Sequence, residues 1–223
     1  MPALSLGPFV DVGCGENGVT TSESLDGLRA AGFSGPVWAV ETVPSRLPNH
    51  EDITCSSELP PTAGVVRAMN VLRQYHPSDC EAALKQWAAV LCDGGHLLEG
   101  TTDKHGHIAC FFDLGSVPYL VFATTFEKGF GPWMFRDYLP QLWRRSVLPG
   151  TDLFAFFELW HSHYVISREV CSLSERFRRS SQSLADARLG AEVSKLPSGM
   201  CFRVPLNWSA DRSLALSLSP ETI

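Results

Sequence analysis

A short apolar stretch near the start of the chain, "FVDVGCGENG" at residues 9–18, carries one acid and leads into spaced glycines. Asp11 is flanked by apolar side chains, and Gly13, Gly15 and Gly18 follow it. Glycines between a strand and a helix let the backbone approach a ligand closely, and they leave helix N-terminal amides available to polar groups. The G-x-G-x-x-G spacing alone is typical of dinucleotide loops and of many other turns.

The carboxylate of Asp11 narrows the class of ligand. In a loop that binds a pyrophosphate, an acid two residues before the first glycine would repel the ligand, whereas it suits an ammonium or sulfonium group. Glu41 ends a second apolar run, "PVWAVE" (36–41). A carboxylate at this place can accept hydrogen bonds from both hydroxyls of a ribose. Together the two acids predict a cationic, ribose-bearing nucleoside as the ligand.

The segments around these residues alternate between expected strands and expected helices over about the first hundred residues. Short apolar runs predict strands and amphipathic segments predict helices. The expected strands are 8–12, 36–41, 53–55, 65–69 and 96–100, and the expected helices are 17–31 and 77–91, the second one stopped by "CDGG" at 92–95. This alternation predicts an α/β fold with a Rossmann-like, mainly parallel sheet flanked by helices.

The pattern changes after Gly100. An antiparallel hairpin is expected from 107–114 and 118–126, helices from 134–146, 152–163 and 172–189, and a last strand from 199–206. We therefore expect a Rossmann-like core over 1–128, a helical and aromatic-rich extension over 129–208 packed on that core, and a polar tail over 209–223.

Four segments of the first half resemble a known family. "VDVGCGENG" resembles motif I of the class I S-adenosylmethionine-dependent methyltransferases, and "VWAVETVP" is similar to their second motif. "GVVRAMNVLRQYHP" resembles the fourth-strand segment, and "AALKQWAAVLCDGGHLLEG" the helix, turn and strand that follow, so the resemblance covers residues 9–102 in order. It implies that the chain binds S-adenosylmethionine and transfers its methyl group to an acceptor. The aromatic-rich second half favours a small-molecule acceptor.

The resemblance also implies roles for individual residues of the glycine loop. Asp11, Gly13, Cys14 and Gly15 line the methionine end of the cofactor, and Glu41 holds its ribose.

Three further residues are implied on the neighbouring strands. Asp52 or Thr54, near the third strand, is the candidate contact for the adenine. Asn70 lies where the fourth strand meets the cofactor or the substrate.

A general base is needed if the methyl acceptor begins protonated. His76 follows the fourth expected strand, and Asp103 and His105 follow the fifth, so all three would lie at the carboxyl end of the sheet, with His76 preferred. Two H-x-H pairs, 105–107 and 161–163, are read as solvated or hydrogen-bonded histidines, so no metal is predicted.

The bulk properties exclude several classes of partner. The chain has 223 residues, a net charge of −6 and seven scattered cysteines without C-x-x-C spacing. The negative charge opposes nucleic-acid and anionic-membrane binding. The absence of a long apolar run, of a secretory signal and of a disulfide pattern favours a cytoplasmic protein. The aromatic cluster of 133–160 is expected in a core or between helices, with a homodimer through these helices as a further possibility.

Two other functions stay open on the sequence. Asn17 stands where the usual third glycine of the loop would be, which favours a regulatory or binding protein on the same fold without catalysis. The literal G-x-G-x-x-G spacing favours a nucleotide-dependent oxidoreductase, which Asp11 opposes. The fourth strand lacks the Asn/Asp-Pro-Pro-aromatic motif of enzymes that methylate amino groups of nucleic acids.

Overall fold

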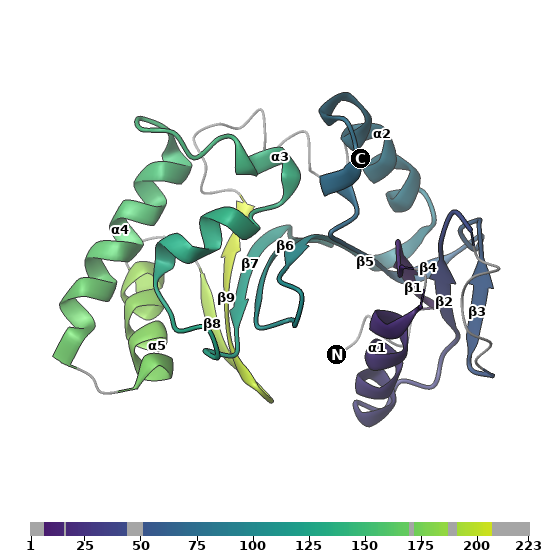
Figure 1. Cartoon of the computed structure of the whole chain (residues 1–223), viewed down its shortest axis with the longest axis horizontal. Helices are drawn as coiled ribbons and strands as arrows, with labels where there is room; N and C mark the ends of the chain where they lie inside the picture. Colours follow the sequence, from purple (N-terminus) through teal and green to yellow (C-terminus); the bar gives the residue numbers. More distant parts are fainter. Residues whose placement is uncertain (1–6, 16, 44–50, 170–171, 187–190, 207–223) are drawn as a thin grey trace. The chain divides into compact units, whose positions relative to one another are not determined.

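The structure is a computed structural model that describes residues 7–15, 17–43, 51–169, 172–186 and 191–206 (Figure 1). The chain forms two compact units. The first contains the described residues up to Glu99 together with Leu114–Ser116, and the second contains Gly100–Asp113 and the described residues from Val117 to Leu206. No helix in the described ranges is long and apolar enough to cross a membrane.

The first unit is built on β1 (Phe9–Val12), β2 (Val37–Val40), β3 (Ile53–Ser56), β4 (Ala63–Met69) and most of β5 (Leu91–Thr102). These strands are ordered β3-β2-β1-β4-β5, and β1 pairs in parallel with β2 and β4, as β2 does with β3. The order reverses between β1 and β4, which makes this the switch point where open α/β sheets bind ligands at the carboxyl ends of their strands. The predicted α/β fold with a Rossmann-like sheet is confirmed.

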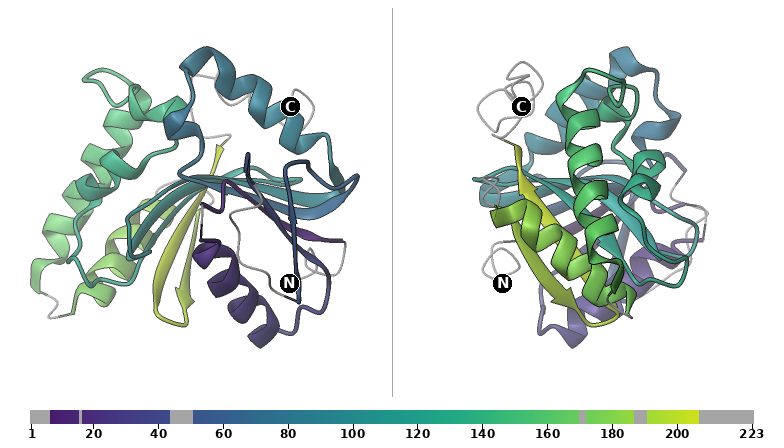
Figure 2. Two further views of the ribbon diagram at one scale, coloured as in Figure 1. Left: turned by 45° about the vertical axis from the view of Figure 1, so that its right-hand side comes forward. Right: turned by 90° about the vertical axis from the view of Figure 1, so that its left-hand side faces the viewer.

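Two helices lie on opposite faces of this sheet, α1 (Val19–Ala30) and α2 (Pro77–Ala88) (Figures 1 and 2). Leu25 of α1 packs into a buried cluster with Phe9, Val37 and Val65, one from each of three strands. Burial of a side chain of this size stabilises the fold by about 1.5–3 kcal/mol. This packing fixes the start of α1, and with it the glycine loop, against the end of β1.

The second unit has an antiparallel set of strands. β6 (Ile108–Leu114) pairs with β7 (Tyr119–Thr124), β7 with β9 (Gly199–Pro205), and β9 with β8 (Glu192–Leu196). The predicted hairpin is thereby confirmed. Helices α4 (Asp152–Ile166) and α5 (Leu173–Leu184) lie side by side in this unit (Figure 2), and α5 contacts β8 and β9.

The aromatic cluster forms the core of the second unit. The ring of Phe122 in β7 lies within 6.2 Å, between centroids, of five others: Phe135, Phe156, Phe157, Trp160 and Phe202. Edge-to-face and offset-stacked pairs at such distances add to the stabilisation from burial. The core interpretation of these residues is therefore the one that the structure supports.

The single helix predicted over 134–146 is wrong. A 3₁₀ segment, η4 (Pro132–Tyr138), and a short helix, α3 (Gln141–Arg144), take its place. Pro140 separates them, and Leu139 before it has ψ 145°, outside the helical region. The proline ring disfavours the helical conformation of the preceding residue, which explains the break.

The predicted helix stop at 92–95 is also wrong, because α2 ends at Ala88 and β5 begins at Leu91. Gly94 adopts φ 75° within β5, and a Cβ on Gly95 would lie 3.1 Å from the Gly64 carbonyl oxygen, so these glycines shape a strand rather than end a helix. Strand β8 has no counterpart among the predicted elements. The predicted tail over 209–223 and the end of the 172–189 helix beyond residue 186 lie outside the described residues.

Candidate functional site

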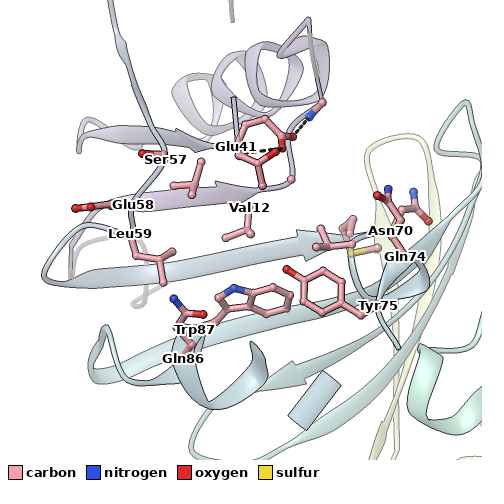
Figure 3. A pocket seen from close by; sticks show the side chains of 16 residues that line it. Val12, Glu41, Ser57, Glu58, Leu59, Asn70, Gln74, Tyr75, Gln86 and Trp87 are labelled. Atoms are coloured by element: carbon pink, nitrogen blue, oxygen red, sulfur yellow. Dashed lines mark hydrogen bonds between the residues drawn. The ribbon is translucent and has the colours of Figure 1, made fainter. Parts of the chain in front are cut away.

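A cavity of about 700 Å³ lies in the first unit, at the carboxyl ends of its parallel strands (Figure 3). The lining residues labelled there are Val12, Glu41, Ser57, Glu58, Leu59, Asn70, Gln74, Tyr75, Gln86 and Trp87. Glu41 and Glu58 are the charged ones among the described residues of the lining, which include no Lys, Arg or His. The volume is that of a small-molecule site, and the charge disfavours ligands with phosphate groups.

Glu41 connects the two loops at the entrance to the cavity. Its Oε2 accepts a hydrogen bond from the Gly15 main-chain nitrogen at 3.1 Å. Its Oε1 accepts from the nitrogen and the hydroxyl of Thr42 at 2.8 and 3.0 Å. Partial burial raises the pKa of Glu41, but the hydrogen bonds from Thr42 and Gly15 outweigh this, and the pKa lies below its ordinary value. Glu41 is therefore a charged acceptor at neutral pH.

The two glycines after β1 bring the backbone to the cavity wall. Gly13 adopts φ 67°, and a Cβ there would lie 2.6 Å from a methyl carbon of Val71. Gly15 adopts φ 76°, and a Cβ there would meet no atom within 4 Å, so this peptide faces open space. The left-handed conformation of both residues explains the need for glycine.

Asp11 does not line the cavity. Its side chain is 1% exposed, and its Oδ1 forms an ion pair with Nη1 of Arg67 at 2.6 Å. Its Oδ2 accepts hydrogen bonds from Thr21 at 2.7 Å and Thr20 at 3.4 Å. The expectation that its free charge faces a cationic ligand therefore needs revision, because Arg67 compensates that charge within the fold. Arg67 is next to Asp11 in the β1–β4 register and was not considered as its partner from the sequence.

Cys14 is buried beside the loop, and it does not line the cavity either. Burial and the nearby Asp11 raise the pKa of its thiol to about 11. The thiol is therefore protonated and unreactive at neutral pH.

The residues proposed for the adenine do not lie at the cavity. Asp52 precedes β3, and Thr54 is an exposed residue within it. The cavity lies at the opposite, carboxyl end of this strand, where Ser57, Glu58 and Leu59 line it. Sequence reasoning missed Glu58, although it is the acid that follows the third strand.

Aromatic and amide side chains form the wall opposite Val12 and Glu41 (Figure 3). The rings of Tyr75 and Trp87 lie edge to face, with centroids 6.4 Å apart. Tyr75 is 40% exposed, whereas Trp87 is only 4% exposed. The pair therefore presents an apolar surface to the cavity that is anchored by a buried ring. Such a wall suits a planar or apolar ligand group.

Asn70 lines the cavity and follows β4 directly. Its φ of 64° is left-handed, a conformation that asparagine tolerates better than most residues. The resulting turn brings Val71 against Gly13, so the ends of β1 and β4 meet at the switch point.

The three candidate bases belong to two different units. His76 belongs to the first unit and caps the start of α2, with its Nδ1 3.4 Å from the Ser78 nitrogen. It does not line the cavity, although the neighbouring Gln74 and Tyr75 do. Asp103 and His105 belong to the second unit.

Asp103 has a structural role that opposes base chemistry. It accepts from Lys128 Nζ at 2.6 Å and from the Ile108 nitrogen at 3.0 Å. Burial raises the pKa of Asp103, but the bonds from Lys128 and Ile108 outweigh this and lower it. The ring of His105 lies 5.7 Å from that of His107, and the described residues contain no group of three or more His, Cys, Asp or Glu side chains that could hold a metal ion.

The chain matches no protein-family model and no curated protein. Among solved structures, it is similar to an O-methyltransferase family protein from Burkholderia thailandensis, with 12% identity and a TM-score of 0.34 over 92% of this chain and 52% of that one. It is also similar to an S-adenosylmethionine-dependent methyltransferase from Clostridium acetobutylicum, with 9% identity and a TM-score of 0.34 over 90% of this chain and 84% of that one. These similar structures are methyltransferases. The chain spans about half the length of the first. The strand order of the first unit, with its reversal between β1 and β4, is what identifies the fold.

Proposed function

We propose that the first unit binds S-adenosylmethionine and that the protein transfers its methyl group to a small-molecule acceptor. The observation that carries this proposal is the hydrogen bond from Gly15 to Glu41 in a cavity without basic side chains among its described lining residues. In a phosphate-binding loop this amide would be available to the anion. Here a carboxylate of the chain itself occupies that position, which favours a nucleoside over a nucleotide and opposes the oxidoreductase alternative.

Each part of the cavity fits a different part of such a ligand. Glu41 already accepts three hydrogen bonds, which leaves about one of its four acceptor sites, on Oε2, for a ribose hydroxyl. Gly13 and Gly15 allow the methionine portion to approach the backbone. Glu58 replaces Asp52 and Thr54 as our candidate acceptor for the exocyclic amine of the adenine. Tyr75 and the other side chains of its wall suit the planar base.

Asp11 acts in this proposal by positioning. Through Thr21 it holds the first turn of α1, and through Arg67 it holds β4, on either side of the glycine loop. The loop is thereby supported before a ligand arrives, and preorganisation of this kind lowers the cost of binding.

When bound, S-adenosylmethionine supplies a methyl group on a sulfonium centre, open to in-line attack. The task of the protein is then mainly alignment of the acceptor with that carbon and exclusion of water. A protonated acceptor atom would pass its proton to a base as the new bond forms, and the electron pair of the broken bond would stay on sulfur. His76 is our candidate for that base, because Asp103 is held by Lys128.

Calorimetric titration with S-adenosylmethionine, S-adenosylhomocysteine and NAD tests the binding step. We expect heat from both sulfur nucleosides and none from NAD. Failure of both sulfur nucleosides to bind would refute the proposal, and binding of NAD alone would favour the oxidoreductase.

Binding without catalysis is the second candidate function. It is favoured by the placement of the candidate bases, since neither His76 nor Asp103 lines the cavity. Mass spectrometry of S-adenosylhomocysteine release, with a panel of small-molecule acceptors, separates the two. Ligand binding with no release on any acceptor would favour the regulatory protein. If the His76→Ala variant releases S-adenosylhomocysteine at an unchanged rate, His76 is not the base, but the proposed methyl transfer still stands.

A further inference from the structure

Helix α4 exposes a narrow apolar stripe, which we call the seam: Ala155, Leu159, Ser162 and Ile166. Leu159 is 45% exposed and Ile166 is 76% exposed. The four residues follow one another at intervals of four, three and four, which is the a/d spacing of a two-stranded coiled coil.

The seam is not used by the unit's own core. The opposite side of α4 buries Leu153, Phe156, Phe157 and Trp160 among the aromatic side chains. The exposed side of a surface helix is normally polar, so apolar residues along the middle of that side indicate a contact with another molecule.

The one polar member of the seam has its hydrogen bond within the helix. The Ser162 hydroxyl donates to the Leu159 carbonyl oxygen at 2.7 Å. It can therefore enter an apolar contact without leaving a donor unsatisfied. Ser162 and Ala155 are also small, which lets a second helix approach closely.

The residues beside the seam indicate what covers it. In heptad notation, Leu159 and Ile166 occupy position a, and Ala155 and Ser162 occupy position d. Glu158 then occupies position g, and His163 of the same helix occupies position e. In a parallel pair of helices, a g residue faces the e residue of the other helix five positions further on. Glu158 would then face the partner's His163, and the two-fold axis would repeat the contact.

We propose that the seam is a self-association surface, on which α4 packs in parallel against α4 of a second copy. The side chains beside the seam select this occupant, because the Glu158 carboxylate meets an imidazole N–H that can donate a hydrogen bond to it. A contact of four seam residues per copy is small, so we expect a weak dimer with a dissociation constant on the order of 100 µM. This surface lies in the second unit, whereas the proposed ligand site lies in the first.

Sedimentation equilibrium of the full chain over a range of concentrations tests the association. The mass should rise from that of a monomer toward that of a dimer, and Leu159→Glu should keep it at the monomer. Leu148→Glu is the matched control, because Leu148 is 56% exposed but lies outside α4, and it should leave the dimer unchanged. A wild-type chain that stays monomeric to about 1 mM would overturn the proposal.

Charge exchange tests the register. Glu158→Lys should weaken the dimer severalfold, and the double variant Glu158→Lys, His163→Glu should restore it. A double variant that remains as weak as the single one would overturn the g-to-e pairing.

A cross-link tests the direction of the helices. Ala155→Cys should form a disulfide-linked dimer with oxidised glutathione, because parallel packing brings residue 155 of both copies together. Antiparallel packing would instead place Ala155 of one copy near the partner's Ile166. The two copies of residue 155 would then lie about 16 Å apart along the helix axis. Ile166→Cys should cross-link likewise. Mixed linkage between these two variants, without linkage of either to itself, would overturn the parallel arrangement.

Discussion

The main-chain nitrogen of Gly15 donates a hydrogen bond to Oε2 of Glu41 across 3.1 Å, and this bond joins the loop after β1 to the end of β2. One acid thus both shapes the glycine loop and remains a charged acceptor at the cavity. Binding and loop geometry are therefore coupled at this residue.

Glu41→Gln should weaken S-adenosylmethionine binding by about tenfold, because hydrogen bonds to a charged acceptor contribute about 1.5–3 kcal/mol. Calorimetry measures this change. Glu51→Gln is the control, since Glu51 is exposed and does not line the cavity. Unchanged affinity in the Glu41 variant would contradict its assignment to the ribose.

Arg67→Met should destabilise the protein by about 3–5 kcal/mol, because it leaves the buried carboxylate of Asp11 without its 2.6 Å partner. Urea unfolding measures the free energy. The double variant Asp11→Asn, Arg67→Met removes both charges and should recover much of the loss. Equal instability of the single and double variants would show that the ion pair is not the cause.

Gly13→Ala should destabilise the fold by about 1–3 kcal/mol, since its Cβ would collide with Val71 at 2.6 Å in a left-handed backbone. Gly27→Ala is the matched control. Gly27 lies within α1, where a Cβ would meet no atom within 4 Å, so this change should stabilise the helix by about 0.5–1 kcal/mol. Thermal unfolding compares the two variants, and a shift of the same sign in both would contradict the account of the loop.

Glu99→Gln should change how stability depends on pH. Burial raises the pKa of Glu99 from 4.5 to about 8, and its Oε2 has no hydrogen-bond partner within the described part of the chain. Between these pH values the unfolded chain releases the proton while the folded chain retains it. The free energy of unfolding of the wild type should therefore fall, relative to the variant, by up to about 1.4 kcal/mol per pH unit as the pH rises through this window.

Denaturant unfolding between pH 4 and pH 9 provides the measurement for Glu99→Gln. Glu81→Gln is the control, because the Glu81 side chain is 64% exposed. Wild-type and Glu99→Gln curves that run parallel across the window would show that Glu99 is ionised in the folded protein.

Much of the fold could be predicted from the sequence because a parallel sheet covered on both faces requires apolar runs between helices. The runs at β1, β2 and β4 and the glycines after β1 carried this information locally. The break at Pro140 was also readable in the sequence, but the apolar periodicity around it favoured one helix. Strand β8 was not predictable in this way, because its residues are exposed or half-buried and mostly polar, so it lacks the apolar run that marks the other strands.

The order of residues along the chain is enough to place an acid, two glycines and the acid of the next strand at the switch point. The contacts that these residues make depend on the tertiary fold. Asp11 and Arg67 are 56 residues apart in the chain, and strand register alone makes them partners. The end of β3 likewise decides that Glu58, and not Asp52, reaches the cavity, and the packing of α4 decides which of its apolar sides remains exposed. Pairing across a sheet and the choice of a buried face depend on contacts between distant segments, which spacing along one chain does not specify.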